Sequence, residues 1–193
     1  MTDHVVRSAR PDEFAAVGAL TADGYRVDGL LTRSAGTAHY EAELLDAAGR
    51  AAAAELLVAV EPGGRLLGTV TWCPPGSGLR ELATRPDQGE FRMLAVTPAA
   101  RRRGVARALV SHCLAEARRH GLAELVLSSL PEMTAAHALY AALGGRRAAE
   151  LDWNPVPPVR LWGFRLPLRP GASVRGGDVH LDHHLQLPVR RCR

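Results

Sequence analysis

The sequence of 193 residues has no lysine, few aromatic residues and only three cysteines, Cys73, Cys113 and Cys192. The cysteines lie far apart and form no Cys-x-x-Cys pair, which argues against a disulfide framework and against a zinc knuckle. No apolar run approaches the roughly 20 residues of a membrane-spanning helix. Acidic residues also occupy the N-terminal stretch where a signal peptide has its apolar core. We therefore expect a soluble, cytoplasmic protein with no membrane partner.

Because lysine is absent, arginine supplies all of the positive charge, and the net charge is +4. Much of this excess comes from residues 169–193, which contain five arginines and two aspartates. Aromatic residues make up 5% of the chain, too few for a basic stripe interleaved with stacking aromatics. We expect no nucleic-acid partner.

The composition that is present, 47% hydrophobic and 23% charged residues, suits one well-buried domain. After Pro170 the sequence loses its periodicity, so we expect a domain over residues 1–168 and a mobile or disordered tail over residues 169–193. The tail contains a ligand-rich cluster, His180, Asp182, His183 and His184. A metal site needs fixed geometry, so we expect no metal there.

The first half of the chain predicts a short strand, two helical stretches and a hairpin. The strand covers Val5 to Arg7, and Pro11 opens a helix that runs to about Ala22. Residues 40–54 are rich in helix-forming side chains, and the run LLVAVEPGGRLLGTVTW after them predicts a β-hairpin. The stretch from Cys73 to Gly89 predicts a long loop, which is a candidate to face the substrate.

The second half alternates strands and helices. We expect strands at Glu90–Val96, Glu124–Ser128 and Val159–Leu168, with helices at Val105–His120 and Met133–Leu143. The first of these helices has a continuous apolar face and a glycine at its end, Gly121.

The junction between the Glu90–Val96 strand and the helix that begins at Val105 suits an anion. The first N–H groups of a helix have no partner within the helix, and they lie at its positive end. Gly104 has no Cβ and Ala106 a minimal side chain, so the backbone can approach a pyrophosphate, while Arg101, Arg102 and Arg103 add charge. The chain has neither a GxxxxGK[ST] nor a GxGxxG pattern, which argues against Walker and Rossmann nucleotide sites.

Here the sequence resembles the GNAT superfamily of acyl-CoA N-acyltransferases, whose coenzyme signature is [QR]-x-x-G-x-[GA] after a central strand. The matching residues are Arg101, Gly104 and Ala106, and a second match to the family follows at Ala136-x-x-Leu139-Tyr140-x-x-Leu143-Gly144. The resemblance implies an α/β (α+β) fold over roughly residues 4–168. Its central, mixed and mostly antiparallel twisted sheet would have about six or seven strands, splayed at the central strands and flanked by about four helices.

The resemblance also implies roles for individual residues. Acetyl-CoA would bind as cosubstrate, its pantetheine arm along the backbone of Leu94, Ala95 and Val96. Its pyrophosphate would meet the amides that follow Arg101; these belong to Arg102, Arg103, Gly104, Val105, Ala106 and Arg107. Tyr140 matches the family tyrosine that protonates the departing thiolate, a role that suits a phenol protonated at neutral pH.

Two positions, Met133 and Glu90, each have more than one interpretation. Met133 stands where the family often has an asparagine that touches the coenzyme arm, and Ser128 or Ser129 is an alternative partner for the arm. Glu90 is the candidate general base, because period-two alternation places it on one strand face with Arg92, Leu94 and Val96. The alternative for Glu90 is a surface carboxylate paired with Arg92.

Other residues have a structural alternative as well. The alternative for Tyr140 is an ordinary tyrosine of the hydrophobic core. The alternative for the arginine run is the solvated start of a helix. Cys113 falls on the apolar face of its helix and is expected to be inert, whereas Cys73 could be exposed. Trp153 shapes an acceptor pocket or packs beneath a turn.

The sequence thus predicts an N-acetyltransferase that moves an acetyl group from acetyl-CoA to a primary amine by direct attack in a ternary complex. The alternative is a non-catalytic acyl-CoA-binding regulatory domain. The amine acceptor, small molecule or peptide, stays open, as do the acyl-chain preference and a homodimer.

Overall fold

The computed structural model describes residues 4–31 and 37–168, and its core is a seven-stranded sheet in the order β1-β2-β3-β4-β5-β7-β6. The strands are β1 (Val5–Ser8), β2 (Glu55–Val60), β3 (Leu66–Cys73), β4 (Gln88–Val96), β5 (Glu124–Ser129), β6 (Arg146–Arg147) and β7 (Trp162–Pro167). Every neighbouring pair is antiparallel except β4 and β5, which are parallel. The mixed, mostly antiparallel sheet expected from the sequence is confirmed.

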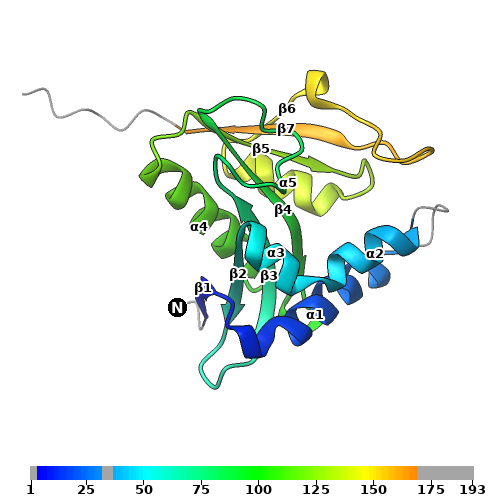
Figure 1. The fold of residues 1–193 in the computed structure, drawn as a ribbon, viewed down its shortest axis with the longest axis vertical. Helices are drawn as coiled ribbons and strands as arrows, with labels where there is room; N and C mark the ends of the chain where they lie inside the picture. The colour runs from blue at the N-terminus through cyan, green and yellow to red at the C-terminus, as the bar shows by residue number, and fades with distance from the viewer. Residues whose placement is uncertain (1–3, 32–36, 169–193) are drawn as a thin grey trace, which may run out of the picture.

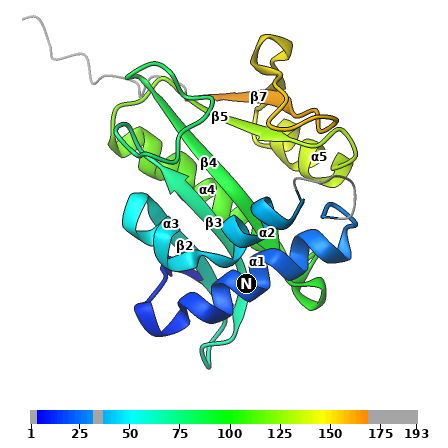
Figure 2. The ribbon, with the colours of Figure 1, turned by 45° about the vertical axis from the view of Figure 1, so that its right-hand side comes forward.

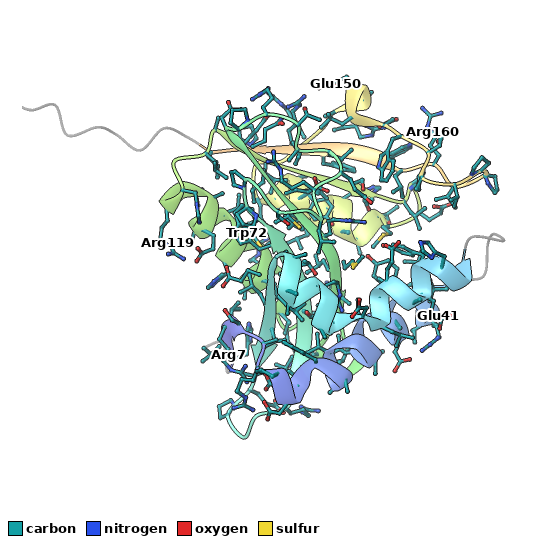
Figure 3. All side chains as sticks on the ribbon, viewed as in Figure 1. Arg7, Glu41, Trp72, Arg119, Glu150 and Arg160 are labelled. Carbon is teal, nitrogen blue, oxygen red and sulfur yellow. The ribbon has the colours of Figure 1, made fainter. Side chains whose placement is uncertain are left out.

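Five α-helices in the described part of the chain cover the sheet on both faces (Figures 1 and 2). They are α1 (Phe14–Val27), α2 (Thr37–Leu45), α3 (Ala47–Ala53), α4 (Val105–Arg119) and α5 (Thr134–Ala142), with 3-10 turns at Pro11–Glu13, Pro98–Ala100 and Ala149–Leu151. α1, α2 and α3 pack on one face, while α4 and α5 pack on the other around Trp72, Leu109 and Tyr140. Figure 3 shows Trp72 inside the molecule and Arg119, at the end of α4, on its edge. No helix in the described ranges is long and apolar enough to cross a membrane.

The central strands part, as the resemblance implied. β4 and β5 pair over three residues each, from Gln88 opposite Glu124 to Glu90 opposite Val126. Beyond Glu90 the remainder of β4 pairs with β3 alone, and β5 continues against β7. Figure 1 shows the result, with β5 and β7 crossing the top of the molecule at a steep angle to β2, β3 and β4. The sheet is therefore open on one side of β4, where backbone groups are left for a ligand.

A β-bulge in β4 changes which side chains share a face. The pairing with β3 shifts between Ala95 and Arg92, and Met93 has a φ of 55°. Met93 consequently packs against α1 and α2, while Leu94 and Val96 pack into the cluster beneath α4. The prediction that Glu90, Arg92, Leu94 and Val96 lie on one face is wrong, because the bulge interrupts the period-two alternation.

Several element boundaries differ from the sequence prediction for local reasons. The single helix expected over residues 40–54 is two helices, because the Asp46 side chain accepts a hydrogen bond from the Gly49 N–H at 2.8 Å and starts α3 anew. The strand expected at Val159–Leu168 begins at Trp162, and β6 was not predicted. The expected tail, with its histidine cluster, lies outside the described residues.

Candidate active site

The turn between β4 and α4 presents a run of free backbone donors. Gly104 lies at the start of α4 with a φ of 81°, in the left-handed region where a side chain is strained, and Arg102 is left-handed too, with a φ of 64°. Among the described residues, no backbone N–H from Arg102 through Arg107 donates to a backbone carbonyl. The first hydrogen bond of the α4 backbone runs from the Ala108 N–H to the Gly104 carbonyl, at 3.0 Å. Six successive amides at the positive end of a helix form a cradle for phosphate oxygens.

The arginines of this turn are tethered to different degrees. Arg101 pairs with Asp28 at the end of α1, at 2.9 Å, and Arg103 lies 3.5 Å from Glu61. Arg102 and Arg107 are exposed and form no ion pair with any residue in the described ranges. The turn therefore keeps two unmatched guanidiniums beside its free amides, which increases its attraction for an anion.

A cavity of about 760 Å³ lies where β4 and β5 part. Residues of β4 and α5, including Leu94 and Tyr140, line it together with the end of β5 and the connection that follows it, from Ser128 to Met133. Residues of α1 and α2 close a second side, and the segment from Trp153 to Leu161 closes a third. Of the site residues predicted from the sequence, Leu94, Met133 and Tyr140 line this cavity. Ala95 instead faces Gly24 of α1, Val96 packs beneath α4, and residues 101–107 lie on the adjoining turn.

Tyr140 is held in this cavity by aromatic neighbours. Its ring lies 5.9 Å from that of Phe91 and 5.5 Å from that of Phe164, between centroids, and the residue is 3% exposed. No residue in the described ranges is hydrogen-bonded to its hydroxyl. Burial raises the pKa of Tyr140 well above its usual range, and nearby Tyr25 adds to the rise. The phenol is therefore protonated and has a hydrogen to donate into the cavity.

Met133 and its neighbours form the wall beside Tyr140. Met133 precedes α5, and its side chain makes no capping hydrogen bond. Ser128 and Ser129 both line the cavity, and the Ser129 hydroxyl lies 3.2 Å from Nε2 of His137. Burial lowers the pKa of His137, so its ring is neutral at neutral pH. Ser128 is the hydroxyl here that has no side-chain partner among the described residues.

Glu90 lies beneath the loop that precedes β4. It is 1% exposed, and its Oε2 accepts hydrogen bonds from the N–H groups of Glu81, Leu82 and Ala83 at 2.9, 2.8 and 3.0 Å. It does not line the cavity, and Arg92 pairs with Glu81 in its place, at 2.8 Å. The alternative of a surface carboxylate paired with Arg92 is thus wrong. The geometry gives Glu90 a loop-holding role, and the prediction that it is the base gains no support from it.

Residues on the far side of the cavity were missed by the sequence reasoning. Tyr25 of α1 and Tyr40 of α2 line it, their rings lie 5.9 Å apart edge to face, and burial raises the pKa of both phenols. With Tyr140, all three tyrosines of the chain meet at this cavity. Glu81 lines it too, and burial raises the pKa of that carboxyl. No local pattern joins these residues, because they come from separate segments of the chain.

Three residues from the sequence analysis remain, namely Trp153, Cys113 and Cys73. Trp153 lines the cavity, as the pocket-shaping alternative required. Cys113 is fully buried, and burial raises its pKa strongly, which fits an inert thiol. Cys73 is fully buried as well, so its expected exposure is wrong, because it ends β3 opposite Glu90 instead of opening the loop. Within residues 4–31 and 37–168, no group of three or more His, Cys, Asp or Glu is arranged to hold a metal ion.

The sequence and the fold were compared with known proteins. The model of the Acetyltransferase (GNAT) family matches residues 25–144, more than half of the chain. No curated protein matches the sequence.

Solved structures with the same fold include an acetyltransferase of the GNAT family from Staphylococcus aureus Mu50. It is 10% identical, with a TM-score of 0.67, over 86% of this chain and 99% of that one. The protein YncA from Salmonella typhimurium, solved with its cofactor acetyl-CoA, is 20% identical with a TM-score of 0.60 over 97% and 99% of the two chains. A GCN5-related N-acetyltransferase from Kribbella flavida is 22% identical with a TM-score of 0.62 over 86% and 98%. Because the family model spans the strand, turn and helices that carry the site, the chain belongs to the GNAT family of acetyltransferases.

Proposed function

We propose that this protein transfers an acetyl group from acetyl-CoA to a primary amine by direct attack in a ternary complex. The observation that carries the proposal is the cavity at the parting of β4 and β5, into which the buried Tyr140 brings a hydroxyl with no hydrogen-bond partner in the described part of the chain. A thioester carbonyl at this point would have a proton donor on one side and open space for an amine on the other. This arrangement suits acyl transfer.

The residues around the cavity fit the two ends of acetyl-CoA. The free amides of residues 102–107, with Arg102 and Arg107, would hold the pyrophosphate. The edge of β4 at Leu94 and Val96 that does not pair with β5 would hold the pantetheine amides. Backbone N–H and C=O groups that lack a partner strand are free to bind a ligand. Ser128, at the mouth of the same opening, is a further donor on the side where Met133 provides no amide.

The chemistry needs a free amine and a proton for the leaving sulfur. Bound acetyl-CoA supplies the activated acetyl group. The amine nitrogen attacks the thioester carbonyl carbon, a C–N bond forms and the C–S bond breaks, and Tyr140 donates its proton to the departing sulfur. Two protons leave the initial ammonium; one replaces the proton of Tyr140 and the other passes to solvent. General acid catalysis of this kind contributes about 10²- to 10⁴-fold.

The test is to incubate the protein with acetyl-CoA and a pool of amines and peptides, and to follow products by mass spectrometry. We expect amines heavier by one acetyl group and an equal amount of free CoA. Stabilisation by acetyl-CoA without any acetylated product would support instead the non-catalytic binding domain. Absence of both product and stabilisation would contradict the coenzyme assignment.

Replacing Gly104 with valine tests the phosphate cradle. The position has a φ of 81°, and no atom lies within 4 Å of the point that a Cβ would occupy, so the cost comes from the backbone conformation. A β-branched residue there either strains the chain by about 1–3 kcal/mol or moves the amides. We expect affinity for acetyl-CoA, measured by calorimetry, to fall at least about tenfold, since two good hydrogen bonds to charged oxygens are worth that much.

Gly121→Val is the matched control for this variant. Gly121 follows the other end of α4, with a φ of 67° and equally open surroundings. Gly121→Val should lower the melting temperature about as much as Gly104→Val does, while the affinity for acetyl-CoA stays unchanged. Equal affinities in the two variants would show that the turn does not hold the coenzyme.

A further inference from the structure

The cavity has two apolar walls. One is the segment from Trp153 to Leu161, whose lining side chains are Trp153, Pro155, Val156, Pro158, Val159 and Leu161. The other contains Leu30, Leu31 and the rings of Tyr25 and Tyr40. Such walls stabilise an apolar ligand body by removing it from water.

The Trp153–Leu161 wall is anchored at its base. Trp153 and Leu161 form an antiparallel bridge, and Asp152 accepts hydrogen bonds from the Gly163 N–H at 3.0 Å and from Arg147 at 2.5 Å. These bonds lower the pKa of Asp152 to about 2, so it stays ionised at neutral pH. Both ends of the wall are therefore held in place before any ligand arrives, which reduces the ordering cost of binding.

Carboxylates outnumber guanidiniums by one among the described side chains that line this cavity: Glu43, Glu81 and Glu132 stand against Arg92 and Arg160. Arg92 pairs with Glu81 at 2.8 Å, and Arg160 lies 3.3 Å from Asp152. Glu43 of α2 lines the same cavity, and its ion-pair partner among the described residues is the exposed ring of His39, at 3.3 Å. The buried guanidinium nearby, Arg50, does not line the cavity and donates hydrogen bonds to Thr21, Thr71 and the Leu44 carbonyl. The balance favours one positive charge on a ligand.

We propose that the acceptor is a primary amine with a single positive charge on an apolar body, and that Glu81 is the base that takes its proton. This inference rests on the proposed acetyl transfer. Glu43 attracts the ammonium, and the Trp153–Leu161 wall receives the body. The excess of one carboxylate over the guanidiniums in the described lining would balance one ammonium and would repel a carboxylate on the acceptor.

Glu81 has the position and the environment that the proton transfer requires. It lines the same cavity as Tyr140, and its Oε1 binds Arg92, which leaves Oε2 for the amine. The titratable and charged groups that face it are Arg92 and Glu90 of β4, Glu43 and Tyr40 of α2, and Cys73 of β3. Burial and the two carboxylates raise its pKa while Arg92 lowers it, with a net rise, and a rise toward neutrality makes a carboxylate a better base.

The experiment compares three amine classes in the same acetyl-CoA assay. Phenethylamine and hexylamine represent the single charge on an apolar body, spermidine the polycation, and phenylalanine the zwitterion. We expect kcat/KM for the first pair to exceed that for the other two by at least about tenfold, the effect of one favourable charge contact. A preference for spermidine or phenylalanine would overturn the acceptor class.

Two isosteric variants then separate binding from proton transfer. Glu81→Gln should lower kcat about 100-fold or more and abolish the acidic limb of the kcat/KM profile against pH, with KM for acetyl-CoA unchanged. Glu43→Gln should raise KM for the amine about tenfold with little change in kcat. Glu41→Gln is the control, because Glu41 is on the same helix but pairs with Arg26 at the outer edge of α2 (Figure 3) and does not line the cavity.

The outcomes distinguish this inference from the proposed function. Glu81→Asp should regain part of the activity and the acidic limb if Glu81 is the base, and a thermal scan checks that each variant is folded. An acidic limb that survives in folded Glu81→Gln would overturn the assignment of Glu81 while amine acetylation itself stands. If no amine of any class is acetylated although acetyl-CoA stabilises the native protein, the proposed transfer itself is wrong.

Discussion

Tyr140→Phe should reduce kcat for amine acetylation by about 10²- to 10⁴-fold, the usual contribution of a general acid. Phenylalanine keeps the edge contacts with Phe91 and Phe164, and the lost hydroxyl has no hydrogen-bond partner among the described residues. The fold and the affinity for acetyl-CoA should therefore be preserved. Steady-state kinetics, with calorimetry of acetyl-CoA binding, measure the two effects separately.

The pH dependence gives this prediction a second readout. Burial raises the pKa of Tyr140, so the native phenol keeps its proton at pH values where an ordinary tyrosine ionises. Activity of the native protein should thus show no loss near pH 10 that is attributable to this residue. Unchanged kcat in a folded Tyr140→Phe variant would show that the sulfur takes its proton from another source, such as water.

Glu90→Ala should destabilise the fold more than any surface charge substitution, by about 3–5 kcal/mol. The change removes one carboxylate and leaves the N–H groups of Glu81, Leu82 and Ala83 without their acceptor. Each unsatisfied buried donor costs about 1–3 kcal/mol, and water entering the gap recovers part of the sum. Urea denaturation of the two proteins measures the difference in unfolding free energy.

Glu150→Ala is the control for this loss. Glu150 pairs with Arg165 at 3.0 Å, but its side chain is 63% exposed, and Figure 3 shows it on the outer edge of the molecule. An exposed pair of this kind contributes about 1 kcal/mol or less. If Glu90→Ala were no more destabilising than Glu150→Ala, Glu90 would not be holding the loop, and a part in the chemistry would again be the better explanation.

Of the two carboxylates Glu90 and Glu81, the sequence pointed to Glu90, whereas the structure places Glu81 at the cavity. Glu90 was prominent in the sequence because it belongs to the strand that leads into the coenzyme turn. In the structure it fixes the backbone of Glu81, and the side chain of Glu81 lines the cavity. Glu90→Ala should therefore also displace Glu81, so its activity should be compared with that of Glu81→Gln only in the folded fraction.

The sequence by itself determined the strand, turn and helix that the proposed coenzyme site uses. The apolar face of α4, the strand before it and Gly104 between them are contiguous, and their local patterns predicted a helix that the structure has at Val105–Arg119. A free helix N-terminus is likewise a local property, because the first amides of any helix have no partner within it. Tyr140 was singled out by the resemblance of its helix to the second family motif, which is also a stretch of contiguous residues.

Only the tertiary structure decided which residues line the rest of the cavity, where we propose that the acceptor binds. The bulge at Met93 redirects side chains along β4, and it arises from pairing with β3, which the strand's own sequence does not encode. Tyr25, Tyr40, Glu81 and Trp153 come from four separate segments and meet because β4 and β5 diverge after Glu90. Contacts between distant segments depend on how the sheet twists and parts, so no local pattern reports them.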